Sequence, residues 1–178
     1  MTVSDTLVKP DMQAVLARTY IGNDLHSFLL PVLEAVSNAM HGIEARFSET
    51  ANKDGKVEIV FKRSNDPINI MVSITDNGVG LTDENYRSFK TPFSGYKLKS
   101  KGRGFGRFIA FKVFSRVLYS TRYEFMGQSS TRTFKFDIAE NNELIFSDAE
   151  PEFKHVGLCV EYKAPLSQWS ELISSLTQ

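Results

Sequence analysis

The hexapeptide DNGVGL at residues 76–81 decides how this sequence is interpreted. It follows an apolar segment, residues 68–75, whose alternation predicts a strand. Asp76 therefore stands where that strand ends, and the two glycines allow the backbone to turn sharply and to approach a flat ligand closely. An Asn-Gly hairpin turn is the alternative interpretation, but residues 83–89, with Thr82 as the N-cap, predict a helix rather than a partner strand.

Upstream of this turn, apolar residues recur at helical spacing from Asn23 or Asp24 to about Phe47 and predict one long helix. Pro31 falls inside the pattern, so a kink or a helix start near it is expected. The helix contains LEAVSNA at residues 33–39, in which Glu34 and Asn38 lie four residues apart. Their side chains project from the same face and could converge on one ligand, although this pair taken alone favours a solvated polar stripe.

Downstream, the run KGRGFGR at residues 101–107 ends a long irregular segment rich in glycine, lysine and serine. Such a segment inside a compact domain is usually functional. The run leads into a helix predicted at residues 107–114, so free backbone amides, a helix amino end and several cations could face a phosphate. A flexible surface loop stays open as an alternative. A dinucleotide-binding fold and a Walker A loop are excluded, because no strand precedes the run and no Gly-Lys-Ser/Thr follows at the required spacing.

The remaining pattern predicts an α+β fold whose second half is mostly antiparallel sheet. A short amphipathic stretch precedes the long helix and a final helix closes the chain. Strands are expected at residues 57–62, 68–75, 117–120, 122–126, 131–138, 143–146 and 158–163, and the terminal helical stretches at residues 12–20 and 166–176.

The composition predicts a single globular domain without a global electrostatic field. Hydrophobic residues make up 42% of the 178 residues, enough to form a core. The 21 Lys and Arg balance the 21 Asp and Glu, which gives no indication of nucleic acid or of an anionic membrane as a partner. One cysteine, Cys159, excludes an internal disulfide framework. With no secretory or membrane-spanning segment, a cytoplasmic setting is expected.

Taken in order, the three stretches resemble the N, G1 and G2 boxes of the GHKL ATPases, the superfamily of gyrase, chaperone ATPases, histidine kinases and MutL. The resemblance covers residues 24–163 and is greatest for chaperone-like and MORC-like members. It implies the Bergerat fold, a two-layer α/β sandwich in which helices cover one face of a mixed, mainly antiparallel sheet. Residues 1–178 would form one ATP-binding domain, with an amino-terminal arm at 1–22 and an ATP lid at 90–106.

The resemblance also implies a role for each matching residue. Asp76 would accept a hydrogen bond from the adenine amino group, Asn38 would coordinate Mg²⁺ through its amide oxygen, and Glu34 would be the catalytic residue that orients or deprotonates the attacking water. Besides Asn38 and Asp76, the implied ATP-binding residues are Gly78, Gly80, Leu81, Lys101, Gly102, Gly104, Phe105, Gly106 and Arg107. This sequence has Gly157-Leu158 where the late strand of these ATPases usually has Gly-Thr, and His41 where an acidic residue often stands.

The function implied is a Mg²⁺-dependent ATPase module with slow turnover, whose nucleotide state drives lid closure and homodimerisation. The segment before the long helix is too short for the phospho-accepting hairpin of a histidine kinase, and nothing after residue 163 could supply the transducer lysine of topoisomerases and MutL. An amino-terminal module of a larger protein is therefore expected, with an unknown downstream domain or client. A non-hydrolysing nucleotide sensor and a protein-interaction domain on the same fold stay open as alternatives.

Overall fold

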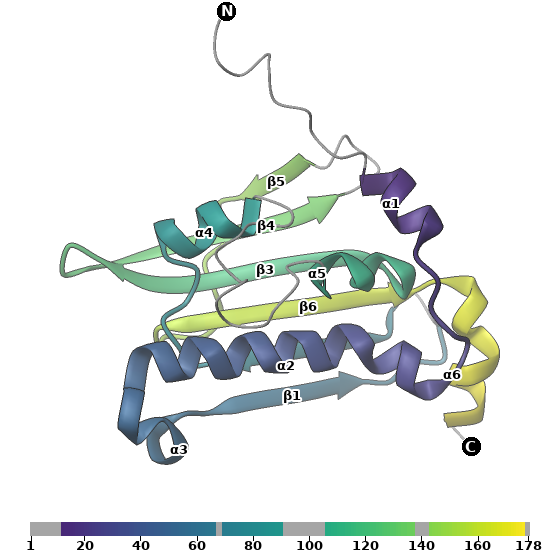
Figure 1. Ribbon diagram of the computed structural model, residues 1–178, viewed down its shortest axis with the longest axis horizontal. Coiled ribbons are helices and arrows are strands. Elements are labelled where there is room, and N and C mark those ends of the chain that lie inside the picture. Colours follow the sequence, from purple (N-terminus) through teal and green to yellow (C-terminus); the bar gives the residue numbers. More distant parts are fainter. Residues whose placement is uncertain (1–11, 67–68, 91–105, 138–142, 177–178) are drawn as a thin grey trace, which may run out of the picture.

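A computed structural model describes residues 12–66, 69–90, 106–137 and 143–176, which form one antiparallel sheet with helices beside it (Figure 1). The strands are β1 (Val57–Lys62), β2 (Met71–Asp76), β3 (Phe114–Phe125), β4 (Gln128–Asp137), β5 (Glu143–Ser147) and β6 (Gly157–Pro165). The helices are α1 (Met12–Arg18), α2 (Leu25–Phe47), α3 (Ala51–Asp54), α4 (Asp83–Lys90), α5 (Gly106–Ile109) and α6 (Ser170–Leu176), with 3₁₀ turns at Ser48–Thr50, Ala110–Lys112 and Ser167–Trp169.

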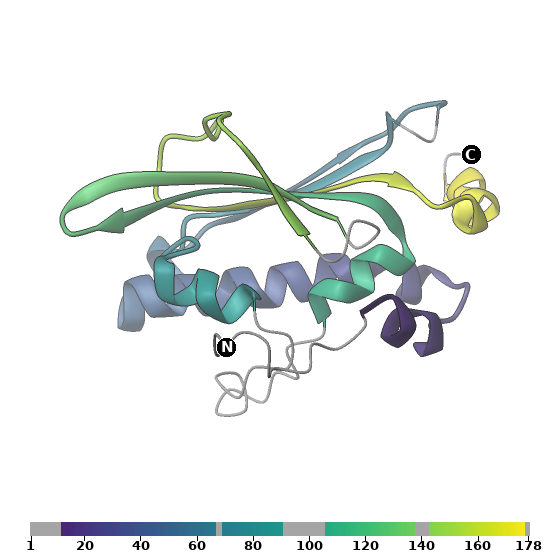
Figure 2. The ribbon, with the colours of Figure 1, turned by 90° about the horizontal axis from the view of Figure 1, so that it is seen from above.

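The six strands lie in the order β1-β2-β6-β3-β4-β5, and every pairing among them is antiparallel. The expected antiparallel character is thus confirmed, while the parallel component of a mixed sheet is not found among these strands. Figure 2 shows α1, α2, α4 and α5 together on one side of the sheet. This is the two-layer α/β arrangement that the resemblance implied. Among the helices of the described ranges, none combines the length and the hydrophobicity of a membrane-spanning segment.

Helix α2 begins where the sequence predicts. The Ser27 amide donates to the Asp24 side chain at 2.8 Å, which caps the first turn. The helix continues through Pro31 to Phe47, so the start considered near Pro31 is wrong. The Pro31 carbonyl accepts a hydrogen bond from the Tyr162 hydroxyl of β6 at 3.1 Å, which ties the helix to the centre of the sheet.

The core between the helices and the sheet is strongly aromatic. Phe28 of α2 contacts Phe114 of β3 and Trp169, with ring centroids 5.6 and 5.5 Å apart, and Phe114 stacks on Tyr162 at 5.2 Å. Part of the expected amino-terminal arm also belongs to this core, because Leu16 of α1 is buried in it. These contacts fix the position of α2 against β6 and β3.

The largest difference from the sequence prediction lies between residues 107 and 126. The predicted helix ends at Lys112 instead of residue 114, and the two predicted strands are one continuous strand, β3. Ser115 and Arg116 are both exposed, so the alternation that marks a strand is interrupted there, and pairing with β6 maintains the strand across the interruption. Strand β2 similarly begins at Met71 rather than at 68.

Candidate functional site

A cavity of about 450 Å³ lies between α2, the turn after β2, α4 and the facing side of the sheet. Six of the residues singled out from the sequence line it: Glu34, Asn38, Asp76, Gly80, Leu81 and Arg107. Gly78 packs against Gly42, and Gly106 packs against Glu34, and both of these contacted residues line the cavity. Lys101, Gly102, Gly104 and Phe105 lie outside the described residues, as does nearly all of the expected lid.

Asp76 is a buried carboxylate at the carboxyl end of β2. Its side chain lines the cavity although the residue is only 5% exposed. Burial raises the pKa of Asp76 to about 6, against the opposing effect of hydrogen bonds from the Gly78 and Leu158 amides. The Gly78 bond measures 2.8 Å. A desolvated acceptor is thus held in fixed orientation, ready for a ligand that carries a hydrogen-bond donor such as an amino group.

The turn after Asp76 is pressed between α2 and the sheet. A methyl group on Gly78 would lie 2.8 Å from the Gly42 carbonyl oxygen of α2, and the Val79 amide donates to that oxygen at 3.1 Å. Gly80 has φ +71°, and a methyl group there would lie 2.6 Å from the Arg122 carbonyl oxygen of β3. Both glycines are therefore required by the packing, and the turn cannot shift without moving α2 or β3.

Arg46, in the last turn of α2, holds the same turn from outside. Its Nη1 donates to the Asn77 carbonyl at 2.6 Å and to the Val156 carbonyl at 3.0 Å. The Asn77 side chain accepts from the Lys56 amide at 2.7 Å and donates to the Asp54 carbonyl at 2.9 Å. The turn after β2, which forms one wall of the cavity, is thus fixed to the segments before β1 and before β6.

Thr121 of β3, which sequence reasoning missed, lies at the centre of the site's polar framework. It is completely buried, and its Oγ1 accepts from the Leu81 amide and donates to the Gly157 carbonyl, both at 2.8 Å. It lies directly opposite Leu158 in the β3–β6 register. The resemblance leads one to expect a threonine after Gly157. In this chain Leu158 follows Gly157 and lines the cavity, and the hydroxyl group comes from Thr121 on the neighbouring strand β3.

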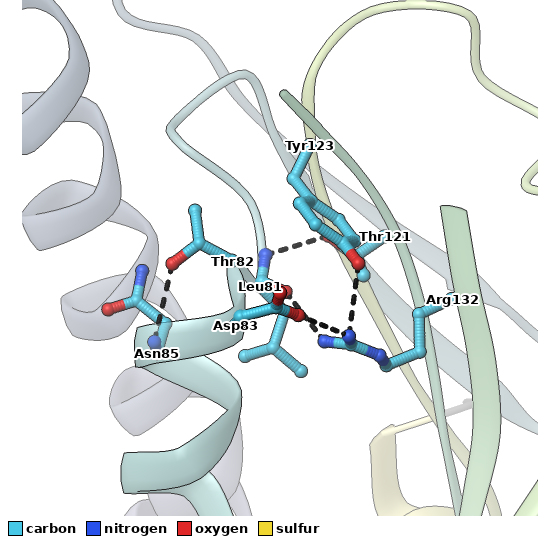
Figure 3. Close-up of polar contacts among 7 residues, drawn as sticks. All are labelled: Leu81, Thr82, Asp83, Asn85, Thr121, Tyr123 and Arg132. Carbon is cyan, nitrogen blue, oxygen red and sulfur yellow. Dashed lines mark hydrogen bonds and ion pairs between the residues drawn. The ribbon is translucent and has the colours of Figure 1, made fainter. Parts of the chain in front are cut away.

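Arg132 of β4 fixes the entry into α4 (Figure 3). It donates to the Leu81 carbonyl at 3.0 Å, to the Asp83 carboxylate at 2.8 Å and to the Tyr123 hydroxyl at 3.0 Å. Its guanidinium also lies 4.0 Å from the centre of the Tyr86 ring. A single cation therefore joins the turn, the start of α4 and two strands.

The start of α4 also adds a polar group to the cavity. Thr82 caps the helix as the sequence predicts, accepting from the Asn85 amide at 3.3 Å (Figure 3). The Asn85 side-chain nitrogen donates to the Gly80 carbonyl at 3.3 Å, and this residue lines the cavity. Asn85 was not among the residues predicted from the sequence.

Glu34 and Asn38 meet on the cavity side of α2. The Asn38 Nδ2 donates to Glu34 Oε1 at 3.2 Å, so the amide oxygen is the opposite end of that group. The Glu34 carboxylate lies against the α5 amino end, where a methyl group on Gly106 would overlap it. The i, i+4 spacing on one helix face therefore brings these two side chains together, as the sequence indicates.

Arg107 supplies a partly buried cation beside Glu34. Its guanidinium lies 4.5 Å from the ring centre of Phe108 and 5.0 Å from that of Phe89. Burial lowers the pKa of Arg107, whereas Tyr119 and Glu34 raise it. The cavity therefore has a carboxylate and a cation next to each other at one end, and the buried Asp76 at the turn.

The family comparison agrees with this geometry. Residues 24–141, more than half of the chain, match the family described as "Histidine kinase-, DNA gyrase B-, and HSP90-like ATPase", so the chain belongs to that family. The family match makes the chain an ATP-binding module of the GHKL type.

A relative of this chain is sporulation kinase B of Bacillus subtilis (strain 168). It is 37% identical over 81 residues, which cover 45% of this chain and 17% of the kinase. The match thus covers only a small part of that relative's length.

Proposed function

We propose that this module binds ATP together with Mg²⁺ and hydrolyses it slowly, with Glu34 acting on the attacking water. Family membership supports ATP binding, and the juxtaposition of Glu34, Asn38 and Arg107 at one end of the cavity supports hydrolysis. Asp76 would receive the adenine amino group at the other end. General acid–base catalysis by one carboxylate is typically worth about 10²–10⁴-fold in rate.

The residues present fit a magnesium ion held mainly by the nucleotide. Asn38 offers an amide oxygen, which is a hard ligand, at the Glu34 end of the cavity. Among the described residues there is no cluster of three or more His, Cys, Asp or Glu side chains able to form a metal site by themselves. Mg²⁺ commonly takes one or two protein ligands and completes its shell with phosphate oxygens and water, and when bound it would neutralise phosphate charge.

The wider expectations belong to the same proposal. Nucleotide state would control closure of the lid at residues 90–106 and homodimerisation, and the module would act within a larger protein, on a downstream domain or client. Phe89 and Arg107, close to either end of the lid in sequence, both line the cavity, which supports a lid that starts and ends at the nucleotide.

Phosphoryl transfer to a partner is the second candidate function. The similarity to sporulation kinase B, a kinase by name, favours it. It differs from hydrolysis in the fate of the γ-phosphate. With γ-labelled ATP, hydrolysis releases labelled inorganic phosphate, whereas transfer leaves the label on protein.

The deciding experiment is calorimetric titration with ATP, with and without Mg²⁺, followed by a phosphate-release assay at saturation. Glu34→Gln keeps an acceptor for the Asn38 amide and should bind ATP with near-native affinity, while turnover falls about 10²-fold or more. Glu124→Gln, at an exposed position on β3, is the matched control and should change neither quantity.

Three other results have distinct meanings. Absence of binding at millimolar ATP would contradict the proposed function and favour an interaction domain. Binding without turnover in the wild type would favour the nucleotide sensor. Unchanged turnover in Glu34→Gln would exclude Glu34 as the catalytic residue.

A further inference from the structure

Strand β1 forms one edge of the sheet and carries exposed apolar side chains. Its only partner among the described strands is β2, and Figure 1 shows it along the lower margin of the sheet. Ile59, Val60 and Phe61 are 44%, 36% and 54% exposed. An exposed apolar edge is a template for pairing with another chain, and natural proteins usually block it or use it.

The two faces of β1 carry different side chains. Ile59 and Phe61 lie opposite the buried Ile74 and Val72 of β2, so they belong to the helix-covered face. The alternate positions, Glu58, Val60 and Lys62, belong to the open face. This sequence places one acid and one base on the same face, two residues on either side of Val60.

We propose that β1 pairs with β1 of a second copy, antiparallel, about a twofold axis through Val60 and perpendicular to the sheet. Such an axis keeps the helix-covered faces of the two copies on the same side. Glu58 then lies opposite the partner's Lys62, and Lys62 opposite the partner's Glu58. On the other face, Ile59 lies opposite the partner's Phe61, and the reverse. The two sheets become one continuous sheet.

The neighbouring registers that preserve the faces are less complementary. With the axis at Ile59, Lys56 lies opposite the partner's Lys62, which places like charges together. With the axis at Phe61, Val60 lies opposite Lys62 and Glu58 has no basic partner. Opposite charges and aromatic–aliphatic pairs stabilise facing strands and like charges destabilise them, so the charge pattern selects the Val60 register and a second copy of this chain as occupant.

This β1 contact is separate from the nucleotide-controlled dimerisation of the proposed function and does not depend on ATP binding, so it is tested by sedimentation equilibrium of the nucleotide-free chain. The wild type should show a concentration-dependent dimer. Glu58→Lys and Lys62→Glu should each place like charges across the interface and raise the dimer Kd at least about tenfold, which corresponds to about 1.4 kcal/mol. Glu124→Lys makes the same charge change at an exposed β3 position and should leave the Kd unchanged.

Mixing provides the sharper test. A one-to-one mixture of Glu58→Lys and Lys62→Glu should form a heterodimer, because one strand then carries two bases and the other two acids. The doubly exchanged variant should again form a homodimer. Circular dichroism checks that the variants remain folded. A wild type that stays monomeric up to about 1 mM, or a dimer equally tight in both single variants, would overturn the proposal.

Discussion

Replacing Asp76 with asparagine should stabilise the empty protein while weakening its hold on ATP. The buried carboxyl has its pKa raised from 3.8 to about 6. The difference is about 2.2 units, and at 1.36 kcal/mol per unit the ionised form costs about 3 kcal/mol relative to the neutral acid. Asparagine keeps the shape, and its amide oxygen can still accept from the Gly78 amide. At pH 8 the free energy of unfolding of the Asp76→Asn variant should exceed that of the wild type by up to about 3 kcal/mol.

The effect should depend on pH with a defined sign. Between pH 3.8 and about 6 the folded protein binds more protons at Asp76 than the unfolded chain does. The stabilisation from the neutral acid is therefore fully present below pH 3.8 and is lost as the pH rises through about 6. The difference between wild type and Asp76→Asn should be largest at pH 8 and should shrink towards zero near pH 4.

Thermal melts across this pH range measure the effect directly. For a domain of this size about 3 kcal/mol corresponds to a rise of about 6–12 °C at pH 8. Calorimetry should show ATP binding at least about tenfold weaker, because a charge-assisted acceptor is lost. Asp148→Asn, at an exposed position, is the control. A variant that is less stable than the wild type at every pH would refute the reasoning.

Two further predictions concern the framework around the turn. Thr121→Val removes the hydroxyl between the Leu81 amide and the Gly157 carbonyl, and should lower the free energy of unfolding by about 2 kcal/mol or more in urea titrations; no loss would mean that these buried groups find other partners. Gly80→Ala forces a side chain onto φ +71° and against the Arg122 carbonyl, so it should cost at least about 1 kcal/mol and reduce ATP affinity; normal melting and binding would show that the turn is free to move.

The parts of the fold predicted correctly are those specified by local sequence. Helix α2 is marked by a capping Asp24 and an uninterrupted period, and β1 by a run of strand-forming residues between a turn and a polar segment. The approach of Glu34 to Asn38 follows from helix geometry alone. Asp76 is located by the end of an apolar strand, which needs no knowledge of distant residues.

The parts that could not be predicted depend on contacts between distant segments. Strand β3 continues through Ser115 and Arg116 because β6 pairs with it, which local alternation does not show. Thr121 occupies an inward position among apolar neighbours, and a polar residue at such a position indicates that its hydroxyl has a buried partner. The sequence does not identify the partners, because they lie 40 and 36 residues away. The contacts of Arg132 to the start of α4 likewise span about fifty residues of chain.

Helix α2 fixes the distance between the two ends of the cavity. The turn that presents Asp76 rests on Gly42, and Glu34 lies eight residues earlier on the same helix, about 12 Å away along its axis. On the proposed function, this one helix sets the spacing between the end of the cavity that would bind the base and the end that would activate water. On the proposed function, discrimination by the number of phosphates is a property of helix length, and inserting or deleting one turn between these residues would change which nucleotide reaches Glu34.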